Sequence, residues 1–388
     1  MNRDITFIYS DSAEKALYTP IAEEAEKRGY KVRMTMDPFA ESEIGVYCQH
    51  INFPETSRLS VIMLHDIIQQ YSNWPDIWLR EPWNKYDIGI LPSAQWAKNW
   101  TEASSLYYTR PRIGVYQVGW PKADVLVKLK EPEVRKAFYL ENGLDPEKRT
   151  VLYAPAWEND GKQDDFVRAM TPLGVNILVK QWDADPKKFP KQVANVQTMK
   201  KLHEGLPGVT ILPPETNIFV AIAASDLLVS EESSTMCEAA MMGIPAVSVS
   251  DWLIPDVTPS RLPKCDYDFV FMTKKVELQE KVRDILEHYD EYRAQTEAFA
   301  EENFPNIGKT SGMIMDIIDD CVAGKPVRYP ALVPREKKRI SPTRYLRHQF
   351  EIFIRYSGEK YAKKSRIYGA FWNTLRSIKQ ALDNRKAT

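Results

Sequence analysis

The sequence is poor in features that would mark a membrane, secreted or zinc-binding protein. Among its 388 residues no run of about eighteen uncharged apolar residues occurs, so we expect no transmembrane helix. The first residues lack the long apolar region and the cleavage site of a signal peptide. The cysteines are few and far apart, without a CxxC pair, which argues against a zinc site and for a reducing cytoplasm: Cys48, Cys237, Cys265 and Cys321.

Several phosphate- and metal-binding patterns are also missing. No GxGxxG follows the first predicted strand and no GxxxxGK[ST] occurs, so neither a dinucleotide site nor a P-loop is indicated. The sequence Asp183-Ala184-Asp185 lies in a loop rich in lysine and proline rather than at a strand end. We therefore expect no metal and no cofactor, and we expect lysines and backbone N–H groups to neutralise any bound phosphate.

Charge is unevenly distributed along the chain. Residues 335–388 hold fifteen Lys/Arg and four Asp/Glu, a net charge of +11. The remainder holds 37 Lys/Arg and 49 Asp/Glu, a net charge of −12. This split predicts an acidic catalytic body with a basic appendage for an anionic partner, either membrane lipid or nucleic acid. The alternative is a basic tail that is merely solvated.

Short apolar runs alternate with helical patterns, which predicts α/β architecture with parallel sheets. The predicted strands lie at residues 5–9, 31–36, 44–47, 59–64, 88–91, 113–118, 150–153, 176–180, 209–212, 227–230 and 246–249. We divide the chain into a first α/β domain at residues 1–130, a second at 131–330 and a basic helical tail at 331–388. Since ligands bind outside the carboxyl ends of parallel strands, residues that follow strands are the site candidates.

The densest polar cluster at a predicted strand end lies in SDLLVSEESSTMCEAAMMGIPAV, residues 225–247. Hydroxyls and unpaired backbone N–H groups at a helix start favour phosphate. Glu238, one turn into the predicted helix, can accept hydrogen bonds from ribose hydroxyls. The other interpretation is a capping box, in which Ser234 or Thr235 caps the helix and Glu238 bonds back to the backbone. The spacing alone favours neither.

Three more segments accompany this one in a fixed order. His65 follows the strand at 59–64, Gly119-Trp120-Pro121-Lys122-Ala123-Asp124 ends the first half, and Leu152-Tyr153-Ala154-Pro155-Ala156-Trp157 opens the second. Together the four segments resemble the CDP-glycerol glycerophosphotransferase family, the teichoic-acid primases and polymerases. The resemblance covers about residues 59–250. It implies a GT-B fold, in which two Rossmann-like domains face a cleft.

The resemblance also implies a reaction. A transferase of this kind moves a glycerol-phosphate-like (alditol phosphate) group from a CDP donor to a lipid-linked acceptor in cell-wall or surface-polymer synthesis. The chain departs from the family at Lys122, where the family has arginine, and at Lys180-Gln181-Trp182-Asp183, where the family's second histidine is absent. Another nucleotide-diphosphate donor therefore stays open. The alternatives are a GT-B nucleotide-sugar glycosyltransferase or epimerase, and a non-catalytic GT-B-like scaffold.

The resemblance and the strand-end rule together nominate site residues. His65 suits the general base, because its ordinary pKa lies near neutrality. Asp66 is the second catalytic candidate, although consecutive side chains leaving a strand diverge. A satisfied, half-buried histidine is the alternative for His65. The expected nucleotide- and phosphate-binding residues are Lys180, Gln181, Ser233, Ser234, Thr235, Glu238 and Trp157. The expected cleft or hinge residues are Trp120, Lys122 and Asp124, and both tryptophans could instead simply pack at the hinge.

The tail contains two apolar stripes with helical spacing. Leu346, Phe350 and Phe353 form the first, and the second comprises Ile367, Phe371, Leu375, Ile378 and Leu382. Basic residues surround both stripes, and Trp372 adds an interfacial aromatic. Such helices lie on anionic membrane surfaces, which predicts a peripheral enzyme at the inner face of the cell membrane. A nucleic-acid partner is not expected, because the body is acidic. The alternative is a C-terminal helix pair packed on the body.

Overall fold

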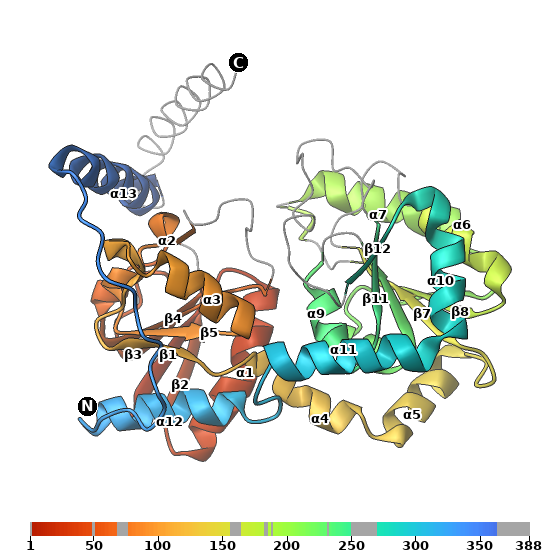
Figure 1. Ribbon diagram of the computed structural model, residues 1–388, viewed down its shortest axis with the longest axis horizontal. Helices are drawn as coiled ribbons and strands as arrows, with labels where there is room; N and C mark the ends of the chain where they lie inside the picture. Colours follow the sequence, from red (N-terminus) through yellow and green to blue (C-terminus); the bar gives the residue numbers. More distant parts are fainter. Residues whose placement is uncertain are drawn as a thin grey trace.

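Two six-stranded parallel sheets form the body of the protein (Figure 1). The computed structural model describes residues 2–48, 51–67, 77–155, 164–181, 185–187, 189–230, 233–249 and 270–362. The predicted α/β architecture is confirmed. The helices are α1 Ser12–Lys27, α2 Ile77–Arg80, α3 Ala94–Ala103, α4 Leu126–Leu129, α5 Pro132–Asn142, α6 Asp164–Met170, α7 Pro190–His203, α8 Ile218–Ala223, α9 Thr235–Met241, α10 Leu278–Glu287, α11 Tyr289–Asn303, α12 Thr310–Val322 and α13 Pro342–Ala362.

The first sheet has the strand order β2-β1-β3-β4-β5-β6, and all its pairings are parallel. Its strands are β1 Asp4–Ile8, β2 Lys31–Thr35, β3 Ser42–Cys48, β4 Ser57–Met63, β5 Ile88–Leu91 and β6 Gly114–Gln117. The central strands are buried on both faces, as their continuous apolar runs require. The order changes direction at β1, so β2 lies on one side and β3 on the other. A ligand-binding crevice is expected at the carboxyl ends beside such a switch.

The second sheet has the order β12-β11-β10-β7-β8-β9 and is parallel too. Its strands are β7 Thr150–Tyr153, β8 Asn176–Val179, β9 Val209–Ile211, β10 Leu227–Ser230, β11 Ala246–Val249 and β12 Val270–Thr273. The direction of the order reverses between β7 and β10. The sequence did not predict β12, because this edge strand leaves Met272 42% exposed and lacks a continuous buried pattern.

Local signals account for the helix ends that position the cleft. Asp11 caps α1 by accepting a hydrogen bond from the backbone N–H of Glu14, and Gly29, with φ of +79°, follows its last turn. Asn217 caps α8 by accepting from the N–H of Phe219. Both caps stand directly after loops that leave the carboxyl ends of strands. They therefore set where each helix enters the space between the sheets.

The chain returns to the first sheet after completing the second. Figure 1 shows α11 and α12 crossing from one sheet to the other. Arg28, at the end of α1, donates hydrogen bonds to Asp316 and Asp319 of α12 at 2.7 and 2.9 Å. Tyr30 donates to Asp319 as well. The segment at 310–322, which the sequence assigned to the second domain, thus packs on α1 of the first.

Helix α13 lies against the first domain beside α2 (Figure 1). The Tyr356 hydroxyl donates to the buried carboxyl of Glu81, and the Tyr356 ring meets Phe53 edge-on. Gln349 donates to the Tyr107 hydroxyl at 3.1 Å. The first predicted tail helix is therefore helical and docked on the body. The second stripe lies in residues 363–388, outside the described residues. Within the described part of the chain, no helix has the length and apolar character to cross a bilayer.

Candidate functional site

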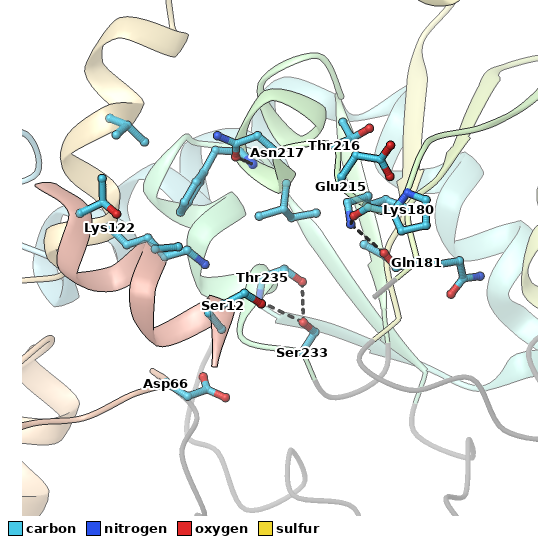
Figure 2. A pocket seen from close by; sticks show the side chains of 18 of the residues that line it. Ser12, Asp66, Lys122, Lys180, Gln181, Glu215, Thr216, Asn217, Ser233 and Thr235 are labelled. Carbon is cyan, nitrogen blue, oxygen red and sulfur yellow. Dashed lines mark hydrogen bonds between the residues drawn. The ribbon is translucent and has the colours of Figure 1, made fainter. Parts of the chain in front are cut away.

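A cavity of about 710 Å³ lies between the two sheets, at the carboxyl ends of their strands. Figure 2 shows its labelled residues entering from both sides. From the first domain come residues of α1 and the segments after β4 and β6, and from the second come the segments after β7, β8, β9 and β10. The lining residues that the sequence predicted are His65, Asp66, Lys122, Lys180, Gln181, Ser233 and Thr235.

The first-domain wall combines the histidine with helix α1. His65 and Asp66 follow β4, and both are half-buried at the cavity. Helix α1 runs along the same cavity. It contributes the polar residues Ser12, Thr19 and Glu23 to the lining, together with small apolar residues. The strand-end prediction therefore placed His65 correctly beside a cavity. The sequence did not predict the α1 residues of the lining, because they lie within a helix and not at a strand end.

The second-domain wall is built around Lys180, which directly follows β8. Its side chain is buried, and Nζ donates to the carbonyl oxygens of Gln181 and Pro214 at 2.7 and 2.6 Å (Figure 2). The ammonium is thereby held between the end of β8 and the loop after β9. That loop adds Glu215, Thr216 and Asn217 to the lining. These three residues were not among the predicted site residues, although the rule that ligands meet strand ends was an available signal for them.

The segment after β10 does not form the capping box that its spacing allowed, and two of its hydroxyl side chains line the cavity. The Ser233 hydroxyl accepts hydrogen bonds from the backbone N–H and the hydroxyl of Thr235, at 3.3 and 2.8 Å, and both residues line the cavity. Ser234 occupies the N-cap position of α9 but makes no side-chain cap bond, and it is not among the lining residues. A capping box is therefore not formed, because Glu238 bonds elsewhere.

Glu238 links the two domains. Its side chain is buried, and Oε1 accepts hydrogen bonds from Nζ of Lys122 at 3.2 Å and from Nε1 of Trp120 at 3.5 Å. The Lys122 ammonium also lies 5.0 Å from the centre of the Phe219 ring. Glu238 itself does not line the cavity. The structure thus gives this carboxylate a partner on the first domain, whereas the sequence suggested a ribose.

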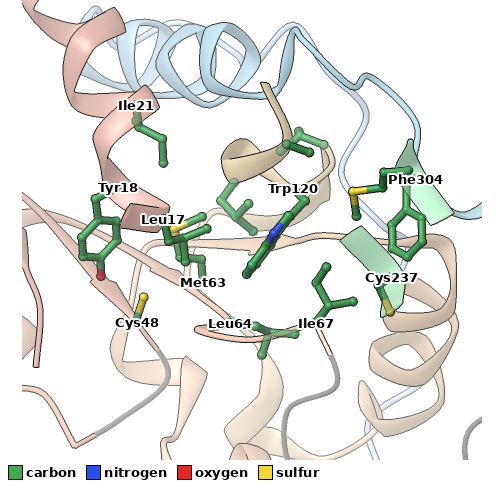
Figure 3. Packing of buried hydrophobic residues seen from close by; sticks show 14 of the residues in the cluster. Leu17, Tyr18, Ile21, Cys48, Met63, Leu64, Ile67, Trp120, Cys237 and Phe304 are labelled. Atoms are coloured by element: carbon green, nitrogen blue, oxygen red, sulfur yellow. The ribbon is translucent and has the colours of Figure 1, made fainter. Parts of the chain in front are cut away.

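Trp120 and Asp124 hold the junction around this ion pair. Trp120 is 5% exposed, and Figure 3 shows it among Leu64, Ile67, Phe304 and Cys237, which is a packing environment at the hinge. Asp124 accepts hydrogen bonds from the backbone N–H groups of Gly308, Thr310 and Ser311 at 2.9, 3.1 and 2.7 Å. It therefore caps α12, the returning helix.

Gly119 explains why this turn begins with glycine. Its φ is +115°, and an added Cβ would lie 2.6 Å from the carbonyl oxygen of Pro305. The turn at 119–124 is thus tightly packed against the segment that leads into α12. Lys122 in this turn faces the cavity. Trp157, also predicted for the site, lies outside the described residues.

Two parallel six-stranded sheets that face one cavity define the GT-B fold, as the resemblance predicted. Solved structures share it at low sequence identity. The wall teichoic acid polymerase TagF aligns with a TM-score of 0.56 and 15% identity, over 83% of this chain and 89% of that chain. A TagF variant soaked with CDPG aligns with a TM-score of 0.55 and 14% identity over the same shares.

Epimerases align equally well. The UDP-GlcNAc 2-epimerase from Neisseria meningitidis, solved with UDP-GlcNAc, has a TM-score of 0.58 and 14% identity, over 82% of this chain and 100% of that chain. The S. aureus MnaA–UDP structure has a TM-score of 0.58 and 11% identity, over 88% and 100%. No protein-family model and no curated protein matches the chain by sequence. At these identities the likeness shows the fold.

Proposed function

We propose that this protein is a transferase that moves a glycerol-phosphate-like group from a CDP-activated alditol to a lipid-linked acceptor in cell-wall or surface-polymer synthesis. One observation carries the proposal. The interdomain cavity brings His65 and Asp66 of the first domain opposite Lys180, Gln181, Ser233 and Thr235 of the second. Support also comes from the fold, which TagF shares.

The proposed reaction assigns a role to each wall. An oxygen of the acceptor hydroxyl attacks the β-phosphorus of the donor, a new P–O bond forms, and the bond to the leaving CMP breaks. His65 takes the proton of the attacking hydroxyl. Lys122 and Lys180 enter from opposite walls and stabilise the negative charge of the diphosphate, and the Ser233 and Thr235 hydroxyls supply hydrogen bonds.

The acceptor in this proposal is carried by a lipid, so the enzyme works as a peripheral protein at the inner face of the membrane. The long α1 wall leaves room for an extended acceptor beside His65. Ser12, Thr19 and Glu23 are polar groups on this wall that suit the hydroxyls of a polyol or sugar.

A second candidate is a GT-B enzyme that uses a UDP- or GDP-sugar, either a glycosyltransferase or an epimerase. Two observations favour it. The chain matches the UDP-GlcNAc 2-epimerases over their whole length. Lys180 and Gln181 occupy the strand end at which the resemblance calls for a second histidine.

Nucleotide binding separates these candidates. Thermal unfolding is measured with CDP-glycerol, UDP-GlcNAc and a GDP-sugar, because a ligand that binds only the folded state raises the unfolding temperature. Stabilisation by CDP-glycerol supports the transferase, and stabilisation by UDP-GlcNAc or a GDP-sugar supports the second candidate. The absence of a response to all of them favours a non-catalytic scaffold.

Turnover tests the role of His65. We expect His65→Ala to lower CMP release from CDP-glycerol by about 10²–10⁴-fold while nucleotide binding changes little, because a general base acts on the transition state. His288→Ala is the matched control, since this histidine is exposed at the end of α10. If His65→Ala retains more than about a tenth of wild-type turnover, His65 is not the base.

A further inference from the structure

Helix α13 has two different apolar faces. One face docks on the first domain through His348, Ile352 and Tyr356, each 9% exposed or less. The other face carries Leu346, Phe350 and Phe353, which are 65%, 63% and 63% exposed. These three lie on one side of the helix, about a third of a turn from the docked face. Large apolar side chains at this exposure form a stripe that no described part of the chain covers, and a stripe of this kind marks an interaction surface.

Basic side chains flank this stripe. Arg344 and Arg347 lie on the first turns of α13 and line a shallow cavity of about 570 Å³ with Thr343, His348, Glu351 and Leu79 of α2. Arg347 is paired with Glu351 at 3.1 Å, while its side chain remains 76% exposed. Both arginines reach the surface at the start of α13, and Arg347 lies about a quarter turn from the apolar stripe.

A second group of basic residues precedes the helix. Lys337, Lys338 and Arg339 are exposed in the segment that leads into α13. This segment is attached to the first domain, since the Lys338 backbone N–H donates to the Ser105 carbonyl at 2.9 Å and the Arg335 N–H to the Ser104 hydroxyl at 2.8 Å. The basic residues are thus held next to α13.

We propose that this face of α13, with its basic flank, docks on an anionic lipid bilayer. Leu346, Phe350 and Phe353 enter the boundary between headgroups and acyl chains, and Arg344 and Arg347 meet lipid phosphates. The distribution of charge favours an anionic bilayer as the partner of this face. The body at residues 1–334 carries a net charge of −12 and is repelled by an anionic surface, so only the basic face approaches.

Docking of α13 on the body makes this surface part of a folded unit. The Tyr356 hydroxyl donates to Glu81, and Arg355 donates to the Arg80 carbonyl. Binding of the stripe to lipid therefore attaches the whole body to the membrane. Deleting the helix would also uncover its contact with the body. Point variants on the exposed face therefore test the proposal better than truncation does.

The test is co-sedimentation of the full chain with phosphatidylcholine vesicles, pure or mixed with phosphatidylglycerol. We expect binding only to the anionic vesicles at low salt, and loss of binding in the triple variant Leu346→Ser, Phe350→Ser, Phe353→Ser. Leu140→Ser is the matched control, because Leu140 is 86% exposed on α5. Unfolding temperatures check that the triple variant remains folded.

Charge reversal tests the basic flank. Each basic side chain near an anionic surface contributes about fivefold to partitioning, so Arg344→Glu with Arg347→Glu should weaken binding by about 25-fold or more. Lys27→Glu with Lys136→Glu is the matched control, since both lysines are exposed on the body, at 72% and 80%. Added salt should weaken wild-type binding.

Two results overturn the proposal. In the first, the triple variant sediments with anionic vesicles as well as the wild type. In the second, the wild type ignores these vesicles at low salt. If it then forms a dimer in size-exclusion chromatography that the triple variant cannot form, the stripe is an interface between two copies. Neither readout depends on the donor nucleotide. Failure here therefore leaves the proposed reaction untouched, and failure of nucleotide binding leaves the membrane surface untouched.

Discussion

The ion pair between Lys122 and Glu238 joins the domains at the cavity edge, and its contribution can be measured. Glu238→Gln removes the negative charge but keeps an oxygen that can accept from Trp120. Lys122→Met removes the positive charge but keeps an unbranched aliphatic side chain near Phe219. The two single variants and the double variant form a thermodynamic cycle that isolates the pair.

The structure sets the expected size of this coupling. At 3.2 Å and an effective dielectric constant of about 20, two unit charges attract by about 5 kcal/mol. Desolvation offsets part of this, because the Glu238 side chain is 3% exposed and the Lys122 side chain 20% exposed. We expect a coupling free energy of about 2 kcal/mol.

The assay is urea unfolding without nucleotide, followed by tryptophan fluorescence. The control cycle uses Lys136 and Glu133, a pair 3.9 Å apart whose side chains are 80% and 84% exposed. An exposed pair of this kind should couple by about 0.5 kcal/mol or less. If the Lys122–Glu238 cycle gives a value no larger than this control, the pair does not hold the domains together and our reasoning is refuted.

The same variant separates the structural role of Glu238 from ribose binding. If the Glu238 carboxylate binds the ribose of the nucleotide and not Lys122, Glu238→Gln should lower nucleotide affinity and leave the free energy of unfolding unchanged. If the Glu238 carboxylate joins the domains, the pattern is the opposite. The free energy of unfolding falls, and nucleotide affinity changes only through a displacement of Lys122, which lines the cavity. Calorimetric titration with nucleotide and urea unfolding of the same preparation distinguish the two.

Three further predictions test other parts of the structure. Asp124→Ala should lower the free energy of unfolding by about 2 kcal/mol, because three backbone N–H groups at the start of α12 lose their acceptor; urea unfolding against wild type measures it. Ser233→Ala should weaken nucleotide binding by roughly tenfold, whereas Ser234→Ala, absent from the cavity lining, should not; calorimetric titration compares them. Burial raises the pKa of Glu81 from 4.5 to about 8. The folded protein therefore holds a proton that the unfolded chain releases, so this stability is complete below the unfolded pKa and is lost as the pH rises toward about 8. Unfolding temperatures of Glu81→Gln should lack this slope, and an identical slope would contradict it.

The strands were predictable because buried parallel strands require continuous apolar runs. The strands at 88–91, 150–153, 227–230 and 246–249 have the bounds that the sequence predicted. The missed strand, β12, lies at the edge of its sheet and has only its first and last residues buried, so its four residues do not stand out from a loop.

The site was partly predictable for a related reason. Parallel strands bring their carboxyl ends to one edge, so residues that follow strands gather there wherever they stand in the chain. This rule placed His65, Lys122, Lys180 and Ser233, each of which lines the cavity. It overlooked Glu23, which is eleven residues from the start of α1 and reaches the cavity only because the helix runs along it.

Local sequence determined which residues end a strand or begin a helix, because backbone hydrogen bonds and side-chain burial act over a few residues. Only the tertiary structure decided which of these groups meet. The spacing around Ser234 and Glu238 suited both a capping box and a ribose contact. In the folded protein the carboxylate reaches Lys122 and Trp120, more than a hundred residues earlier in the chain. That contact depends on how one sheet packs against the other, and no short-range pattern contains this information.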